Sequence, residues 1–205
     1  MDSTFKITLA YLKELGACRG GQRAFQKAFP DGGEYQEVLD RCAEEGRLDF
    51  GGWLLERIGP TDEVRIYDNT VDTPEKGIIF AGRIEFKLSA AAKFIRSGCG
   101  IEAGCGIEAG WGIEAGEGIE AGWGIEAGDG IKAGDGIEAG DGIKAGEGIE
   151  AGWGIEAGDD FCIFAGLATP KTKWETFAVV TAKTKPDNLM SGFWKPLEGF
   201  NEKTS

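Results

Sequence analysis

The sequence predicts an α+β protein in which a short N-terminal helical region precedes a three-sided parallel β-solenoid with irregular β end caps. Three observations lead to this prediction. Ten consecutive six-residue units fill residues 99–158, and Gly, Ile, Ala and Gly recur unchanged in each unit. Before them, residues 4–58 carry apolar side chains at helical spacing. On both sides of the repeat block, less regular β-rich segments replace it.

Residues 1–60 are predicted to form the helical region, with three or four short helices. Leu9, Leu12 and Leu15 recur at three-residue spacing, and segments rich in glycine and proline separate the helices. Asp49 is expected to cap the last helix. Leu-rich segments of this kind, with an Ala-Cys pair and phenylalanines, are similar to those at the front of phage and prophage proteins. That resemblance implies an origin in a mobile element.

Residues 61–98 are predicted to be a β-rich lead-in that caps the N-terminal end of the solenoid. The segments 64–67 and 84–88 have the composition of strands. Residues 79–82 read Ile-Phe-Ala-Gly and echo the unit, with Phe80 in place of its charged residue. We expect this segment to be a worn repeat that shields an open edge of the solenoid.

The repeat block at residues 99–158 is predicted to be the solenoid itself. A six-residue unit supplies one short strand and one corner but encloses no core, so neighbouring units must stack to exclude water. Two positions vary: the first residue of the unit, and the residue after Ile. The latter is Glu everywhere except Lys132 and Lys144. Both variable positions are expected to face water.

The spacing of the unit, read as Ala-Gly-x-Gly-Ile-x, resembles the hexapeptide repeat of left-handed parallel β-helix proteins. The resemblance implies a triangular coil of three units, about 18 residues in all, with Ile and Ala pointing into the prism. This chain departs from the family pattern because one inward position holds only Ala, with Ile in the other. Acyltransferases and carbonic anhydrases built on this fold depend on histidine, and the chain contains none. The resemblance therefore implies a fold without the family's enzymatic activities.

The charges in the repeat favour a coil of three units over a coil of two. Side chains one coil apart lie about 4.8 Å from each other along the axis, and like charges at that separation repel. With three units per coil, Lys132 lies between Glu114 and Glu150, and Lys144 lies on Glu126. With two units per coil, the two lysines would stack on each other. The three-sided coil is therefore the predicted one.

With this period, one face of the solenoid is the most acidic. Its four units begin at residues 99, 117, 135 and 153, and their charges sum to −6, against −2 and −3 on the other two faces. Four glutamates form one column on this first face, which we call the acidic column: Glu102, Glu120, Glu138 and Glu156. The predicted partner-binding residues are Glu102, Glu117, Glu120, Asp135, Glu138, Glu156, Trp111, Trp123 and Trp153. The same register scatters the three tryptophans over three faces.

The C-terminal residues 159–205 are predicted to form a second cap. Asp159 and Asp160 add two residues after the last unit, which implies a bulge or loop. Residues 163–166 repeat the worn pattern, with Phe164 in the charged position. Residues 177–182 have the composition of a strand, and the tail from Pro186 onward is expected to be irregular.

The charge balance and the missing residue types limit the function. Residues 99–158 carry thirteen acidic and two basic side chains, so −11 of the net charge of −13 belongs to the repeats. An acidic surface repels phosphate, which disfavours direct nucleic-acid binding. Without histidine there is no Ser/His or Cys/His nucleophile pair. We expect no enzymatic activity, no cofactor and no metal site.

The cellular location is predicted from cysteine usage and hydropathy. Five cysteines, an odd number without a Cys-x-x-Cys pair, fit a reducing compartment. No run of apolar residues approaches the roughly 18 that a transmembrane helix needs. The prediction is a cytoplasmic protein without a membrane partner.

The expected function is that of a non-enzymatic acidic interaction protein with a basic, nucleic-acid-binding host protein as partner. In its most specific form it is a phage- or mobile-element-encoded inhibitor of a host defence machine, similar to an anti-CRISPR protein that imitates nucleic acid. The alternative is a structural spacer or homo-oligomerisation element, with recognition by the helical region, since an open solenoid end can stack on another copy. The acidic side chains also have a simpler explanation, because charge keeps a β-structure soluble. Recent duplication would likewise leave the units alike.

Overall fold

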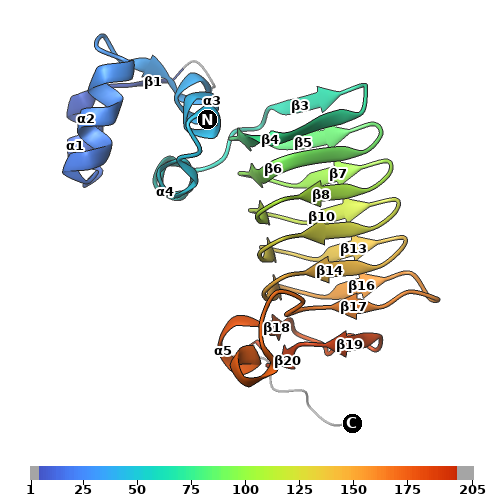
Figure 1. Ribbon diagram of the computed structural model, residues 1–205. Coiled ribbons are helices and arrows are strands. Elements are labelled where there is room, and N and C mark those ends of the chain that lie inside the picture. Colours follow the sequence, from blue (N-terminus) through green and yellow to red (C-terminus); the bar gives the residue numbers. More distant parts are fainter. Residues whose placement is uncertain (1–4, 198–205) are drawn as a thin grey trace.

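The computed structural model describes residues 5–197. A helical region leads directly into a parallel β-solenoid of about seven turns, and short strands and one helix close its C-terminal end (Figure 1). The predicted fold class is confirmed. No helix among the described residues is both long and apolar enough to cross a membrane.

The described part of the helical region, from residue 5 onward, contains four helices and a small antiparallel pair of strands, β1 with β2. The bounds are β1 (Lys6–Ile7), α1 (Leu9–Glu14), α2 (Arg19–Ala28), β2 (Gly33–Glu34), α3 (Tyr35–Glu44) and α4 (Leu48–Ile58). The side chains of Thr8 and Cys18 accept hydrogen bonds from the first turns of α1 and α2. A capping box between Glu34 and Glu37 begins α3.

The predicted cap of the last helix is wrong. α4 begins at Leu48, and Arg47 occupies the N-cap position without a side-chain hydrogen bond to the helix. Asp49 lies inside the first turn. Its negative charge there interacts favourably with the positive end of the helix dipole, which explains why an acidic residue stands near this helix start.

The solenoid begins with four strands of unequal length and continues with one three-residue strand per repeat unit. The first four are β3 (Val64–Tyr67), β4 (Val71–Phe80), β5 (Arg83–Phe86) and β6 (Ala90–Ser97). The repeat strands are β7 (Ile101–Ala103), β8 (Ile107–Ala109), β9 (Ile113–Ala115), β10 (Ile119–Ala121), β11 (Ile125–Ala127), β12 (Ile131–Ala133), β13 (Ile137–Ala139), β14 (Ile143–Ala145), β15 (Ile149–Ala151) and β16 (Ile155–Ala157). All these strands pair in parallel.

The strand register confirms the three-sided coil, in which three successive units complete one turn. The first face is a six-stranded sheet in the order β16-β13-β10-β7-β5-β3, and one larger sheet forms the other two faces. Glu120 pairs with both Glu102 and Glu138. Lys132 lies between Glu114 and Glu150, as the charge argument predicts.

The core of the solenoid consists of the two apolar residues of each unit. All ten isoleucines of the repeat are at most 3% exposed, and nine of the ten alanines are buried. In nine of the ten units, the glycine that ends the unit lies at a corner against the backbone of the previous coil; a Cβ at Gly128, for example, would be 2.1 Å from the carbonyl oxygen of Gly110. The next coil therefore stacks closely only because this position has no side chain.

The predicted alignment of the N-terminal worn repeat is wrong by one residue. Ile78, not Ile79, pairs with Ile95, and Phe80 pairs with Ser97. Ile78 and Phe80 thus point into the solenoid core, while Ile79 belongs to the apolar cluster of the helical region. This shift turns the residue expected at the surface into a core residue, because an alternating strand reverses its faces when it slips by one position.

The C-terminal cap holds more regular structure than predicted. Its elements are β17 (Ile163–Phe164), the 3₁₀ helix η1 (Lys171–Lys173), α5 (Trp174–Phe177), β18 (Val179–Thr181), β19 (Leu189–Ser191) and β20 (Phe193–Trp194). Ile163 pairs with Ile143, two residues beyond the regular period, so the two extra aspartates form the predicted bulge. Phe177 ends α5 instead of beginning a strand. The tail is not irregular up to Trp194, since β19 and β20 pair with β17 and β18; residues 198–205 lie outside the described part of the chain.

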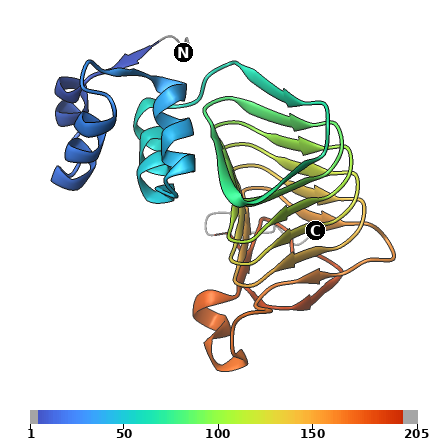
Figure 2. The same ribbon diagram turned by 45° about the horizontal axis from the view of Figure 1, so that its top comes forward.

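The helical region packs on the first coils of the solenoid through α3 and α4 (Figures 1 and 2). The side-chain amide of Gln36 in α3 donates to the Ile79 carbonyl at 2.9 Å and accepts from the Ala81 N–H at 3.0 Å. In α4, Gly52 faces the guanidinium of Arg96 so closely that no Cβ fits between them. Arg96 donates to the Leu48 carbonyl and pairs with Glu114. These contacts fix the helices to the solenoid.

Candidate acidic binding groove

The acidic column forms one wall of an open groove along the first face. The groove has a volume of about 420 Å³. Its floor is the backbone at four glycines, residues 100, 118, 136 and 154, and its second wall is the corner column of Glu117, Asp135 and Trp153. Because a glycine stands beside each carboxylate row, the groove is open and its acidic side chains are accessible from solvent.

The register of the parallel strands puts these carboxylates in rows. Each coil adds one carboxylate to the acidic column at a spacing of about 4.8 Å. The coil that contains Glu120 also contributes Glu117 from the corner, and the coil that contains Glu138 also contributes Asp135. Glu102 is half-buried, whereas the other three glutamates of the column are exposed. The arrangement is therefore a rigid ladder of negative charge on a β-sheet.

A cationic side chain of the same chain lies at each end of the groove. At the N-terminal end, the guanidinium of Arg83 pairs with Glu102 and lies 3.4 Å from Glu117. At the C-terminal end, the Lys183 ammonium lies 3.0 Å from the centre of the Trp153 ring. Within residues 5–197, no cation lies within ion-pair distance of the carboxylates between these ends. These unpaired carboxylates are Glu120, Asp135, Glu138 and Glu156.

The corresponding grooves on the other two faces are less acidic. On the first face, six carboxylates and one guanidinium line the groove, a net charge of −5. On the second face, four carboxylates and Lys144 line it, a net charge of −3. On the third face, three carboxylates are balanced by Arg96, Lys132 and Lys195. Among the three, the first face alone carries an acidic column without a lysine.

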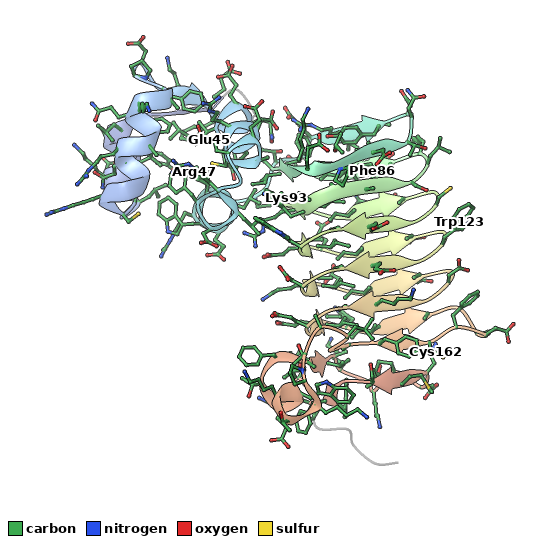
Figure 3. All side chains as sticks on the ribbon, in the orientation of Figure 1. Glu45, Arg47, Phe86, Lys93, Trp123 and Cys162 are labelled. Atoms are coloured by element: carbon green, nitrogen blue, oxygen red, sulfur yellow. The ribbon has the colours of Figure 1, made fainter. Side chains whose placement is uncertain are left out.

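The structure brings together seven of the nine predicted partner-binding residues. The six acids and Trp153 all line the same groove. Trp111 instead stacks on Phe94 with ring centres 5.9 Å apart. Lys93, labelled in Figure 3, lies over the Trp111 ring at 4.1 Å. Trp123 is 59% exposed and projects from a different corner (Figure 3). The predicted scatter of the tryptophans over three faces is confirmed.

Sequence reasoning did not identify the two cationic side chains at the ends of the groove, Arg83 and Lys183. Arg83 directly precedes Ile84, which pairs with Ile101 and so occupies the inward position of a unit. The alternation of Ile84, Glu85 and Phe86 was the available signal, because it places Arg83 at the glycine position of a worn unit. Lys183 gave no signal, since its placement depends on the irregular path between β18 and β19.

Cys99, one coil before Glu117 at the same position of the unit, is a neutral thiol. The Cys99 Sγ lies 3.5 Å from the Thr61 carbonyl oxygen and donates to it. Burial, and after it the charge of Glu117, raises the pKa of this thiol. At neutral pH Cys99 therefore adds no charge to the groove. Among the described residues, no three His, Cys, Asp or Glu side chains gather as metal ligands.

Comparison with known proteins bears on the helical region alone. Residues 1–59 match the family described as the YdhT N-terminal domain. The match ends before β3 and includes none of the solenoid. No curated protein and no solved structure matches the chain.

Proposed function

We propose that this protein is a non-enzymatic interaction protein whose acidic groove binds a basic surface of another protein. The observation that carries the proposal is the run of four carboxylates between Arg83 and Lys183 that no cation within residues 5–197 pairs with. On the other faces, lysines of the same chain neutralise part of the corresponding column. On the first face, a cationic partner would supply that neutralisation.

Coulomb repulsion gives this arrangement a cost that binding removes. Two unit charges about 4 Å apart interact with roughly 1 kcal/mol in water and about 4 kcal/mol near a protein surface. The parallel register holds neighbouring carboxylates of the acidic column at about this separation. Cations inserted between them would convert repulsion into attraction. The sheet already fixes the backbone that carries the column, so little backbone ordering is needed when the partner binds.

The charge density of the groove supports the more specific proposal of nucleic-acid mimicry. The two central coils each present two carboxylates, Glu117 with Glu120 and Asp135 with Glu138. At about 4.8 Å per coil this is one charge per roughly 2.4 Å. Duplex DNA carries one per about 1.7 Å, and one strand carries one per about 3.4 Å. The charge density of the groove therefore lies between that of single-stranded and duplex DNA, and a protein that binds nucleic acid would bind a similar density of charge.

In its most specific form, the proposal is an inhibitor encoded by a phage or other mobile element that occupies the nucleic-acid groove of a host defence machine. The partner would be a basic, nucleic-acid-binding protein, and the groove itself would bind neither nucleic acid nor an anionic membrane. The five cysteines are free in the structure, which suits action in a reducing compartment such as the cytoplasm.

A charge-matched pair of variants tests the proposal. The first changes the acidic column to glutamine: E102Q, E120Q, E138Q and E156Q. The control changes four glutamates on the other faces: E108Q, E126Q, E147Q and E150Q. Each removes four negative charges, so both take the formal net charge from −13 to −9. Any difference in binding between the two variants therefore results from the position of the removed charges and not from the change in total charge.

Binding of an arginine-rich peptide is measured first by calorimetry, at low and high salt. The wild type and the control are expected to bind with similar affinity, and the column variant at least about tenfold more weakly. Equal binding by all three proteins would contradict the proposal. Capture from bacterial lysate with duplex DNA as competitor then tests mimicry, because DNA should release a partner that normally holds nucleic acid.

The structure weighs against the alternative of end-to-end stacking. In β3, Arg65 occupies an inward position at the N-terminal end of the solenoid, since it pairs with Ile84. Its guanidinium lies 4.4 Å from the centre of the Phe80 ring and 3.0 Å from Asp40 of α3. A second copy stacked on this end would bury that ion pair. An inward charge of this kind is a common device against edge-to-edge association.

A further inference from the structure

Helix α2 carries the opposite charge from the solenoid. Its ten residues include three cations and no acid. Arg19, Arg23 and Lys27 follow one another at four-residue spacing and therefore lie along one side of the helix. All three are exposed, while Gly21 and Phe25 are buried on the opposite side. We call Arg19, Arg23 and Lys27 the basic face of α2.

Within residues 5–197, no carboxylate pairs with this basic face. The ion pairs of the helical region involve other arginines: Arg41 and Arg47 pair with Glu44 and Glu45, and Arg65 pairs with Asp40. In both views α1 and α2 lie on the side of the helical region away from the solenoid, with α3 and α4 in between (Figures 1 and 2). The basic face of α2 therefore does not contact the acidic groove of its own chain.

We propose that the basic face of α2 binds in the acidic groove of a second copy of the chain. The inference rests on the proposed function, because both treat the groove as a site for cations on a protein surface. It goes further by naming the occupant. The chain would then contain both halves of one interface, a basic helix and an acidic groove, held apart within each copy.

The dimensions of the two surfaces agree. Eight positions along the chain separate Arg19 from Lys27, a rise of about 12 Å along the helix. Two steps separate Glu120 from Glu156, the first and last glutamates of the column that Arg83 leaves unpaired, which is about 10 Å along the solenoid. Successive cations rise by about 6 Å and successive carboxylates by about 4.8 Å. Long arginine and lysine side chains absorb a difference of this size, and guanidinium groups bind carboxylates through paired hydrogen bonds.

The two surfaces differ, so the contact between copies is heterologous. Each pair of copies leaves one basic face and one groove free, and further copies can add until a ring closes or a filament forms. A neighbouring α2 in the groove also excludes any other basic partner. Self-association and partner binding would therefore compete for the same carboxylates.

Charge-reversal variants of the full chain provide the test, read by sedimentation velocity. The wild type should form species larger than the 21.8 kDa chain at about 50 mM salt and dissociate at about 500 mM. One variant reverses the helix: R19E, R23E and K27E. The other reverses the groove: E120K, E138K and E156K. Each alone should associate at least about tenfold more weakly than the wild type.

Mixing the two variants gives the decisive outcome. The groove-reversed copy retains a basic α2, which fits the acidic groove of the helix-reversed copy. The acidic α2 of the latter fits the basic groove of the former. The mixture should therefore recover assembly that neither variant shows alone, and damage to folding cannot produce such recovery. A control with E108K, E126K and E150K makes the same charge change on other faces and should associate like the wild type.

Several results would overturn the proposal: a wild type that stays monomeric at low salt, a control that dissociates as much as the groove variant, or a mixture that stays monomeric. Duplex DNA bound by a monomeric wild type, and lost on reversing α2, would assign the basic face to nucleic acid instead. The helix-reversed variant keeps its groove intact. Its affinity for the arginine-rich peptide therefore tests the proposed function separately from self-association.

Discussion

The two invariant glycines of each repeat unit have different surroundings. At the end of a unit, a Cβ on Gly128 would lie 2.1 Å from a backbone oxygen of the previous coil. At the second position of the next unit, a Cβ on Gly130 would lie 3.2 Å from the Gly148 oxygen. The sequence shows both positions as equally invariant. At these two positions, the structure shows that only Gly128 is required by close approach of two coils.

Substitution of these glycines by alanine should therefore give unequal results. Gly128→Ala forces two backbones apart and is expected to lower the free energy of unfolding by about 1–3 kcal/mol, the cost of overpacking a close contact. Gly130→Ala needs a shift of a few tenths of an ångström and should cost less than about 1 kcal/mol. Urea unfolding followed by circular dichroism measures both. Equal losses would show that the corner contact does not limit the packing of coils.

The positions of single residues in the site were predictable where the period of the repeat determines which face of the solenoid they lie on. The period placed Glu102, Glu120 and Glu138 in one column, and the strand pairing agrees. It could not foresee that Trp111 packs on Phe94, since Phe94 precedes the repeat block and its contact depends on how the helices dock. Periodicity gives the neighbours along the axis, whereas contacts between the helices and the solenoid depend on tertiary packing.

At the scale of elements, the helical region buries two ionisable groups. Cys42 in α3 is 4% exposed, and Tyr35 is fully buried, with its hydroxyl donating to the Gly59 carbonyl at 3.1 Å. Burial raises the pKa of the Cys42 thiol from 9.0 to about 12. The charge of Arg47 lowers this pKa and the charge of Glu45 raises it, both by smaller amounts. Burial also raises the pKa of the Tyr35 hydroxyl. Both groups are therefore neutral in the folded helical region.

The raised thiol pKa predicts that the helical region loses stability in alkali. The unfolded thiol ionises above its ordinary pKa of 9.0, while the folded thiol stays protonated up to about 12. The thiol's contribution is thus complete below pH 9 and is lost as the pH rises toward 12, by about 1 kcal/mol per pH unit. Urea unfolding at pH 8 and pH 10.5 should show a larger loss in the wild type than in Cys42→Ala. An equal loss in both would assign the effect to other groups, Tyr35 included.

Regular elements were predicted better than the segments that flank them. The repeat strands follow from one period, but β6 contains no glycine and β4 contains only Gly77, and only parts of these strands have a recognisable strand pattern. β19 pairs with β17, which lies before η1, α5 and β18 in the chain. The sequence of β19 contains no apolar run that would predict a strand. Its partner strand, not its local sequence, makes it a strand.

At the scale of the whole molecule, the helical region, the solenoid and the C-terminal cap protect one another's edges. Asp40 and Gln36 of α3 cover the first coil, through Arg65 and the backbone at Ile79 and Ala81. Such capping lets the number of coils between the ends vary, because each coil contacts only its neighbours. The near identity of the units fits this modular construction.

Deleting residues 135–152 separates a binding groove from a spacer. The deletion removes one complete coil of three units and joins Gly134 to Trp153, so that Glu120 stacks directly on Glu156. It brings no new like-charged pair together on the other two faces, where Glu126 meets Phe164 and Lys132 meets Thr181. It removes five acids and one lysine, which again takes the net charge from −13 to −9. We expect the shortened chain to fold cooperatively, because every retained coil keeps equivalent neighbours.

The shortened groove should bind its basic partner less well. The acidic column falls from four carboxylates to three and the corner column loses Asp135, so the affinity for the arginine-rich peptide should fall several-fold and depend less steeply on salt. Peptide titration at several salt concentrations measures both changes. A spacer with recognition by the helical region would instead keep its affinity for a partner and change only the distance between its ends. Unchanged affinity and salt dependence in a folded deletion variant would therefore move the recognition surface from the solenoid to the helices.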